Sequence, residues 1–111
     1  MIERGDIVLV NLDPVVGSEV GKTRPAVILQ NGLANRSSPT VTVIPISSQV
    51  DRVFPFQVLL PAGEGGLDRD SKALCEQIRT VSRRRLLDTI GRLPAKRLDE
   101  IRAALDRHLW F

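Results

Sequence analysis

The 111-residue sequence has few of the side chains on which many enzyme mechanisms depend. It contains one histidine, one cysteine, one tryptophan and no tyrosine. A zinc site needs several spaced histidine or cysteine ligands, and His108 lies too close to the chain end to suit a Ser-His-Asp triad. The single Cys75 excludes an internal disulfide, and a reducing cytoplasm fits it. No run of 18 apolar residues is present to form a transmembrane helix.

The charged side chains are unevenly distributed. The formal net charge is +3, but residues 79–107 alone carry nine basic and four acidic side chains, a local charge of +5. The remainder of the chain therefore carries −2. A basic region of this kind suits a polyanion such as a nucleic acid. The alternative is a solvent-exposed helix face that binds an acidic protein.

Residues 21–23, Gly-Lys-Thr, match the end of a phosphate-binding P-loop, but their surroundings do not. That motif needs a glycine five residues earlier, where Val16 stands, and it must lead into a helix. Here Arg24-Pro25 and the strand-like residues 26–29 follow instead. The segment is therefore predicted to be a loop that presents Lys22, Thr23 and Arg24 at the mouth of a strand.

The pattern of apolar and turn-forming residues predicts a mainly β domain that spans residues 1–111. The expected strands are 7–12, 24–30, 40–47, 56–60, 71–81 and 89–93, with loops at 13–23, 31–39 and 61–66. Pro45 inside a strand indicates a bulge or an edge, and Ser82 is expected to cap a short helical turn. Pro94 begins a C-terminal helix with an apolar face. The residues of that face are Leu98, Ile101, Leu105 and Leu109. The pattern indicates a small barrel or curled antiparallel sheet with an appended helix.

Arg24 is the strongest candidate for chemistry, because a guanidinium is always charged and matches a phosphate with two donors. The alternative is a surface arginine that pairs with Glu19 or an aspartate. Glu19 could be a base or only that salt-bridge partner. Ser47 and Ser48 place hydroxyls where a strand ends, although serines there often serve only to form turns.

Other polar and aromatic residues have two interpretations each. Gln77, close to Arg79 in the fifth expected strand, could read a base edge or pair locally. Phe54 and Phe56 could stack on bases, but a place in the core is the stronger expectation for Phe56. The acids of residues 68–70 could in principle hold Mg²⁺, yet loop acids without clustered partners usually face solvent. We therefore expect no metal site.

Four segments carry a resemblance that covers nearly the whole chain. They are RGDIVLVNLDPVVGSEVGKTRPAVILQN (4–31), VIPISS (43–48), FPFQVLL (54–60) and LCEQIRTV (74–81). In this order and spacing they resemble the MazF/PemK family of toxin endoribonucleases, and the G-S-E-x-x-G-x-x-R-P box is the most diagnostic part. The resemblance implies a small SH3-like barrel of the CcdB/PemK type with short helices, assembled as a homodimer.

The resemblance also implies a function and a set of site residues. It implies sequence-specific, metal-independent cleavage of single-stranded RNA, mainly messenger RNA, without a cofactor. It further implies a cognate antitoxin whose disordered C-terminal segment occupies the RNA groove. The family's catalytic arginine falls on Arg24, its catalytic threonine on Ser47, and a glutamate that some members need on Glu19. The candidates for contact with RNA are Lys22, Thr23, Ser48, Phe56, Gln77 and Arg79.

Ser47 departs from the family threonine. It keeps the hydroxyl and loses the methyl group that fixes the rotamer, so we expect reduced but persistent activity. Two alternatives stay open. Gyrase-poison toxins share the barrel and use a tryptophan near the C-terminus, which Trp110 resembles, although core or dimer packing is the stronger expectation for that residue. The other alternative is a barrel that binds RNA without cleaving it.

Overall fold

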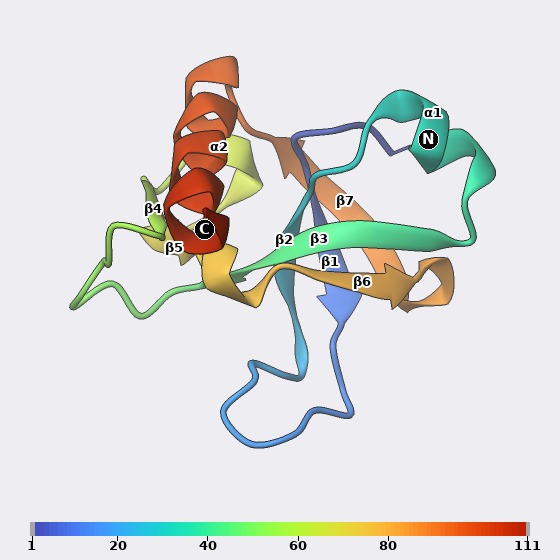
Figure 1. Ribbon diagram of the computed structural model, residues 1–111, viewed down its shortest axis with the longest axis horizontal. Coiled ribbons are helices and arrows are strands. Elements are labelled where there is room, and N and C mark those ends of the chain that lie inside the picture. Colours follow the sequence, from blue (N-terminus) through green and yellow to red (C-terminus); the bar gives the residue numbers. More distant parts are fainter. Residues whose placement is uncertain (1, 111) are drawn as a thin grey trace.

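The computed structural model describes residues 2–110, which form seven strands, two α-helices and three 3₁₀ turns (Figure 1). The strands are β1 (Asp6–Asn11), β2 (Thr23–Ile28), β3 (Thr40–Ser47), β4 (Val58–Leu60), β5 (Ser71–Ala73), β6 (Arg79–Ser82) and β7 (Leu86–Arg92). The helices are α1 (Gly32–Ser37) and α2 (Ala95–Leu109). The 3₁₀ turns are η1 (Glu64–Gly66), η2 (Cys75–Gln77) and η3 (Arg83–Arg85).

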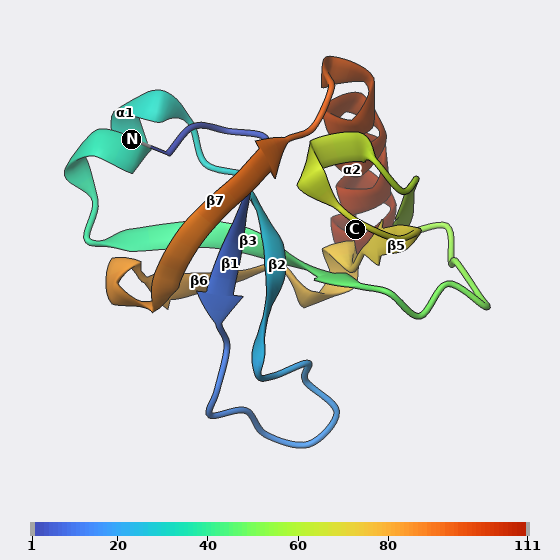
Figure 2. The same ribbon diagram turned by 180° about the vertical axis from the view of Figure 1, so that it is seen from behind.

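The strands form one antiparallel sheet that curls on itself. Their order is β4-β5-β3-β2-β1-β7, and β6 pairs with β3 beside this path. Seen from behind, β7 crosses over β1, while α2 stands beside β5 at the other end of the molecule (Figure 2). The predicted fold class, a mainly β chain with a curled antiparallel sheet and a C-terminal helix, is confirmed.

The core strands are apolar on both faces because both faces are covered. Ile7, Val27 and Ile44 belong to a buried cluster that includes Ile101 of α2. Their neighbours on the opposite face, such as Val8 and Ala26, belong to a second buried cluster. Alternate residues of a strand point to opposite faces, so each strand contributes to both clusters.

Pro45 lies in the middle of β3, where neither a bulge nor an edge is found. β3 pairs with β6 through Thr40–Val43 and with β5 through Ile46–Ser47, and Pro45 falls between these two partners. Its carbonyl accepts a hydrogen bond from the Leu74 N–H at 2.9 Å. Proline has no N–H to donate. At Pro45 the backbone faces the gap between β5 and β6, so no hydrogen bond between strands is lost.

Several expected boundaries are wrong. The expected loop 31–39 contains α1, whose N-cap is Asn31, because its side chain accepts the Ala34 N–H at 3.1 Å. The expected strand 71–81 is interrupted by η2, so Gln77 lies in a helical turn and not in a strand. The fourth strand begins at Val58 instead of residue 56, and β7 begins at Leu86 instead of residue 89.

Other local predictions hold. The Ser82 hydroxyl accepts the Arg84 N–H, which caps η3 as expected. The C-terminal helix forms, although it begins at Ala95, and Pro94 is its N-cap instead of its first residue. Leu98 and Leu105 pack beside the buried Ile101. Leu109, however, is 49% exposed and extends the apolar face beyond the core. Trp110 is 84% exposed, so a place in the core of this chain is wrong for it.

The only cysteine is predicted to be inert in the folded protein. Cys75 is fully buried, and loss of hydration together with the nearby Glu76 carboxylate raises the pKa of its thiol to about 12. The thiolate is the form that attacks thiol reagents, and a pKa of about 12 makes it scarce at pH 8. Ellman's reagent should label the native protein on the order of 10³-fold more slowly than protein denatured in guanidinium. Equal labelling rates would contradict the buried position.

Candidate active site

Arg24 lies near the start of β2, opposite Val10 of β1. Its side chain is half-buried, and its Nε donates to the Gly21 carbonyl at 3.0 Å. The Nη1 atom faces the Ile46 carbonyl at a long 3.5 Å, and within residues 2–110 Nη2 has no hydrogen-bond partner. Backbone groups of the β1–β2 loop and of β3 therefore hold the guanidinium in place and leave part of it available to a ligand.

Arg24 opens onto a cavity of about 330 Å³. The lining residues are Arg24, Pro25, Ile46, Ser48, Leu67, Asp68, Arg69 and Ser71. Arg24 and Arg69 bring two guanidinium groups, and Ser48 and Ser71 bring two hydroxyls. The Asp68 carboxylate, 3.7 Å from Arg69 Nε, offsets part of this charge. The balance is positive, which suits an anionic phosphodiester. Ser48 was expected in the site. Arg69 and Ser71 were not, and their only sequence signal was the polar run of residues 68–71.

Ser47 ends β3 directly beside this cavity, between Ile46 and Ser48. Its Oγ accepts the Gln49 N–H at 3.1 Å. A hydroxyl that accepts through its oxygen keeps its proton for donation. The turn therefore fixes the position of the Ser47 hydroxyl and leaves its proton free for another acceptor.

Glu19 lies apart from the Arg24 cavity. Its carboxylate accepts the Val16 N–H at 2.7 Å within the same loop, and it does not line the cavity of Arg24. It lines a second cavity of about 440 Å³ between the β1–β2 loop and the η2–β6 segment. The residues of that cavity are Ser18, Glu19, Glu76, Gln77, Ile78 and Arg79.

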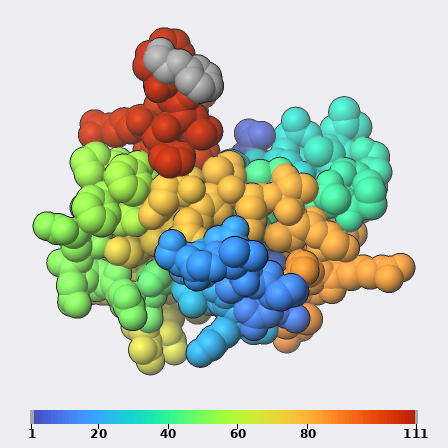
Figure 3. Space-filling view, turned by 60° about the horizontal axis from the view of Figure 1, so that its bottom comes forward, coloured from blue at the N-terminus to red at the C-terminus, as the bar shows by residue number. Residues whose placement is uncertain are grey.

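Gln77 and Arg79 hold the β1–β2 loop through both backbone groups of Val20. The Val20 N–H donates to Gln77 Oε1 at 2.9 Å, and Arg79 Nη1 donates to the Val20 carbonyl at 3.2 Å. Arg79 also donates through Nη2 to Gln77 Oε1 at 2.9 Å and through Nε to the Gln77 carbonyl at 3.3 Å. Figure 3 shows this loop, in blue, lying against the yellow and orange η2–β6 segment. All three nitrogens of the Arg79 guanidinium are thus engaged within the protein.

The remaining candidates are accessible to different degrees. Lys22 and Thr23 are exposed where the loop enters β2, and Lys22 takes a left-handed φ of 63°. Phe56 is half-buried in the β3–β4 loop, outside both core clusters, so the stronger expectation for it was wrong. Its ring stacks on that of Phe54, with 5.3 Å between the ring centres and 2° between the ring planes. The guanidinium carbon of Arg52 lies 5.2 Å from the centre of the Phe54 ring.

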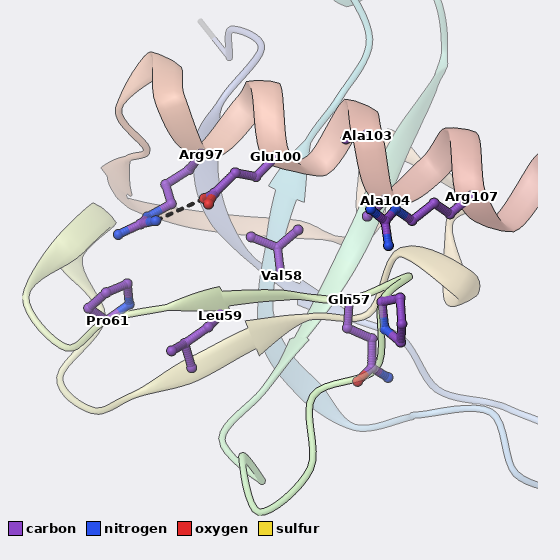
Figure 4. Close-up of a pocket in the computed structure, with 10 residues that line it drawn as sticks. Gln57, Val58, Leu59, Pro61, Arg97, Glu100, Ala103, Ala104 and Arg107 are labelled. Atoms are coloured by element: carbon purple, nitrogen blue, oxygen red, sulfur yellow. Dashed lines mark hydrogen bonds and ion pairs between the residues drawn. The ribbon is translucent and has the colours of Figure 1, made fainter.

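A cavity of about 450 Å³ between α2 and β4 contains none of the expected site residues (Figure 4). Val58 points from β4 toward the helix, whereas Gln57 and Leu59 point away from it. At the rim, Arg97 pairs with Glu100 at 2.8 Å and with Glu64 of η1 at 2.7 Å. The hydrogen bond from Arg97 lowers the pKa of the Glu64 carboxyl. The pair with Glu64 ties α2 to η1, the pair with Glu100 lies within α2, and both have a structural role.

The described residues show two further features. Between residues 2 and 110, no group of three or more His, Cys, Asp or Glu side chains is placed to hold a metal ion. No helix of the same range combines the length and the apolar character needed to cross a membrane.

Comparison with known proteins places the chain in a family. The family model described as "PemK-like, MazF-like toxin of type II toxin-antitoxin system" matches residues 3–109. Endoribonuclease MazF9 of Mycobacterium tuberculosis is 45% identical, with 98% of this chain and 97% of that protein covered. Endoribonuclease EndoA of Bacillus subtilis is 42% identical, with 95% and 91% covered. These relatives do not favour the gyrase-poison alternative.

Solved structures agree with this placement. MazF from Deinococcus radiodurans has a TM-score of 0.86 and 29% identity, with 99% of this chain and 97% of that chain covered. A MazE-MazF structure from the same organism has a TM-score of 0.78 and 29% identity, with 97% and 95% covered. Because the family model and these relatives each match almost the entire chain, the chain belongs to the PemK-like, MazF-like toxins of type II toxin-antitoxin systems.

Proposed function

We propose that this protein is an endoribonuclease that cleaves single-stranded RNA, mainly messenger RNA, at specific sequences. The observation that carries the proposal is the half-buried Arg24, held by two backbone carbonyls and open to a cavity with a second guanidinium, one carboxylate and two hydroxyls. In the proposed reaction the ribose 2′-OH attacks the adjacent phosphorus. The O2′–P bond forms, the P–O5′ bond breaks, and the products are a 2′,3′-cyclic phosphate and a 5′-OH.

Arg24 and Ser47 have distinct roles in this reaction. Negative charge grows on the non-bridging phosphate oxygens in the transition state, and Arg24 donates to them from a fixed position. Ser47 donates its free hydroxyl proton to the same phosphate group and positions it. The 2′-OH nucleophile comes from the substrate, so the attack needs no metal-bound water.

A base must accept the 2′-OH proton, and a second proton must reach the leaving O5′. Arginine is a poor base because its pKa exceeds about 12. Glu19 is the candidate base, although its carboxylate is turned toward the Val16 N–H in the free protein. Catalytic contacts often tighten only when substrate binds, so Glu19 would have to turn toward the RNA.

The proposal includes a cellular setting and two protein partners. A cognate antitoxin would block the RNA groove with a disordered C-terminal segment, and a second copy of the chain would complete a homodimer. Structures of MazE-MazF from Deinococcus radiodurans support the first partner. A reducing cytoplasm, where messenger RNA is found, suits a chain whose only cysteine is buried.

The direct test is incubation of the purified protein with a long single-stranded RNA in EDTA, followed by mapping of both product ends. We expect discrete cuts that leave a cyclic phosphate and a 5′-OH. Ser47→Thr should cleave at least as fast as the natural chain, and Ser47→Ala should be slower. RNA that is bound but uncut would favour the non-catalytic barrel. RNA that is neither bound nor cut, with trapped cleaved DNA in a gyrase assay, would favour the gyrase poison.

Arg79 is predicted to position the loop and not to contact RNA phosphate. Arg79→Met removes the donors to Val20 and Gln77, so the β1–β2 loop should lose its fixed place. We expect kcat/KM for RNA cleavage to fall about 10- to 100-fold, because small misplacements near the reaction are costly. The salt dependence of RNA binding should keep its slope, whereas loss of a phosphate contact would reduce that slope by about 0.7.

Arg102→Met on the exposed side of α2 is the matched control, because it removes the same charge away from the loop. An Arg79→Met protein with a reduced salt slope and an unchanged kcat would instead identify Arg79 as a phosphate ligand.

A further inference from the structure

We propose that the cavity between the β1–β2 loop and η2 binds one nucleobase of the RNA, and that this base carries an exocyclic amino group. Adenine, cytosine and guanine meet this condition and uracil does not. Glu76 is the acceptor that selects the amino group. This assignment rests on the proposed cleavage of RNA and adds to it a site for sequence recognition.

The charges of this cavity suit a neutral base and not a phosphate. Its lining residues include two acids, Glu19 and Glu76, against one base, Arg79. The donors of Arg79 are already used by neutral groups, the Val20 carbonyl and Gln77. The cavity around Arg24, in contrast, has two guanidinium groups against the single carboxylate of Asp68. Phosphate is drawn to the Arg24 cavity and repelled by the cavity of Glu19 and Glu76. The base edge has N–H donors, which carboxylates accept.

The Gln77 amide presents a donor to the base. Its Oε1 accepts hydrogen bonds from the Val20 N–H and from Arg79, both at 2.9 Å. These two donors fix which end of the amide is oxygen. The Nε2 group is therefore the end that remains to donate, in a cavity that Glu19 and Glu76 also line.

Glu76 is held as an acceptor with an unused oxygen. Its Oε2 accepts from Gln57 Nε2 at 2.8 Å, and Gln57 Oε1 in turn accepts the Phe54 N–H at 3.1 Å. Its Oε1 is shielded from solvent and has no hydrogen-bond partner within the described residues. A buried polar atom without a partner is costly, and an N–H donor from a ligand would remove that cost after a small side-chain adjustment.

The donors and acceptors of the cavity distinguish uracil from the other bases. An amino group brings two N–H bonds, and on adenine and cytosine it lies next to a ring nitrogen that can accept from Gln77. Guanine offers neighbouring N1–H and N2–H groups to one carboxylate, with O6 beside them. Uracil has one N–H between two carbonyl oxygens. If one of these oxygens accepts from Gln77 Nε2, the other would still face a carboxylate. We therefore expect uracil to be rejected at this position.

The cavity is also connected to the proposed reaction centre. Val20 is bound by Gln77 and Arg79, and the next residue, Gly21, accepts from Arg24 Nε through its carbonyl. A base that fills the cavity would therefore press on the same loop that orients Arg24. Recognition of the base and placement of the phosphodiester would then depend on each other.

The test is a cleavage profile on a pool of single-stranded RNA with randomised sequence. The proteins compared are the natural chain, Glu76→Gln and Asp88→Asn, where Asp88 is an exposed acid of β7 that controls for the lost charge. We expect the natural chain and Asp88→Asn to disfavour uracil about 10- to 100-fold at one position near the cut. In Glu76→Gln this discrimination should fall to about threefold or less at that position alone.

The outcomes separate this assignment from the proposed function. If Glu76→Gln cuts the pool with the same sequence profile as the natural chain, the proposed base site is wrong and the proposed nuclease activity stands. A uniform loss of cutting at all sequences also overturns it, because it identifies Glu76 as structural. An uncut pool with the natural chain overturns both proposals. A second substrate confirms the group that is read: replacing the selected base by its amino-free analogue should slow the natural chain about as much as uracil does.

Discussion

Arg24→Ala is expected to lower kcat for RNA cleavage by about 10²–10³-fold, the usual effect of removing one fixed donor to a developing oxyanion. The fold should survive, because Arg24 lies at the open end of β2 and is only half-buried. Its side-chain hydrogen bonds go to two backbone carbonyls, Gly21 at 3.0 Å and Ile46 at a long 3.5 Å, and not to other side chains. The measurement is the single-turnover cleavage rate, with the melting temperature as a check on folding.

Arg24→Lys separates charge from geometry. Lysine keeps the positive charge but lacks the planar pair of donors, so we expect a loss of at least about tenfold. Arg36→Ala, on the exposed face of α1, removes an arginine far from the cavity and should leave the rate unchanged. If Arg24→Ala cleaves RNA at the natural rate, the reaction centre lies elsewhere.

The strands of the curled sheet could be predicted because both of their faces are buried, so their sequences are largely apolar. β1 and β3 lie within one residue of their expected bounds, and α2 follows from the spacing of Leu98, Ile101 and Leu105. The break at η2 could not be predicted in the same way. Residues 71–81 contain no glycine, proline, asparagine or aspartate to signal a turn. The break coincides with the place where the partner of β3 changes from β6 to β5 around Pro45.

The site was predictable only where its residues adjoin a strand in a recognisable motif. Arg24 and Ser47 stand at the ends of β2 and β3, where the sequence expectation put them. Arg69 and Ser71 reach the same cavity from a loop whose place depends on the folded sheet. The contacts of Val20 with Gln77 and Arg79 join residues 57 and 59 positions apart, and no local pattern reveals such pairs.

The glycines of η1 show how closely that turn packs on β7. A Cβ added to Gly91 would lie 2.3 Å from the carbonyl carbon and oxygen of Gly65 and 2.7 Å from the nitrogen of Gly66. A Cβ added to Gly66 would lie 2.0 Å from the Ile90 carbonyl oxygen. These contacts involve backbone atoms on both sides, so no side chain can move away to make room. The sequence indicated a loop at residues 61–66, but it did not indicate its packing partner.

Gly91→Ala is therefore expected to destabilise the protein by about 3 kcal/mol or more, in the upper range for overpacking. This is a large share of the free energy of unfolding of a domain of this size, so the melting temperature should fall by more than about 10 °C. Gly32→Ala is the control. Its added Cβ has the Arg36 side chain as nearest neighbour at 3.7 Å, and alanine favours the helix α1 that begins there. Equal melting temperatures for the two variants would show that η1 does not pack on β7 in solution. The chain that leaves η1 carries Arg69 and Ser71 into the Arg24 cavity, so Gly91→Ala should also weaken RNA cleavage below its melting temperature.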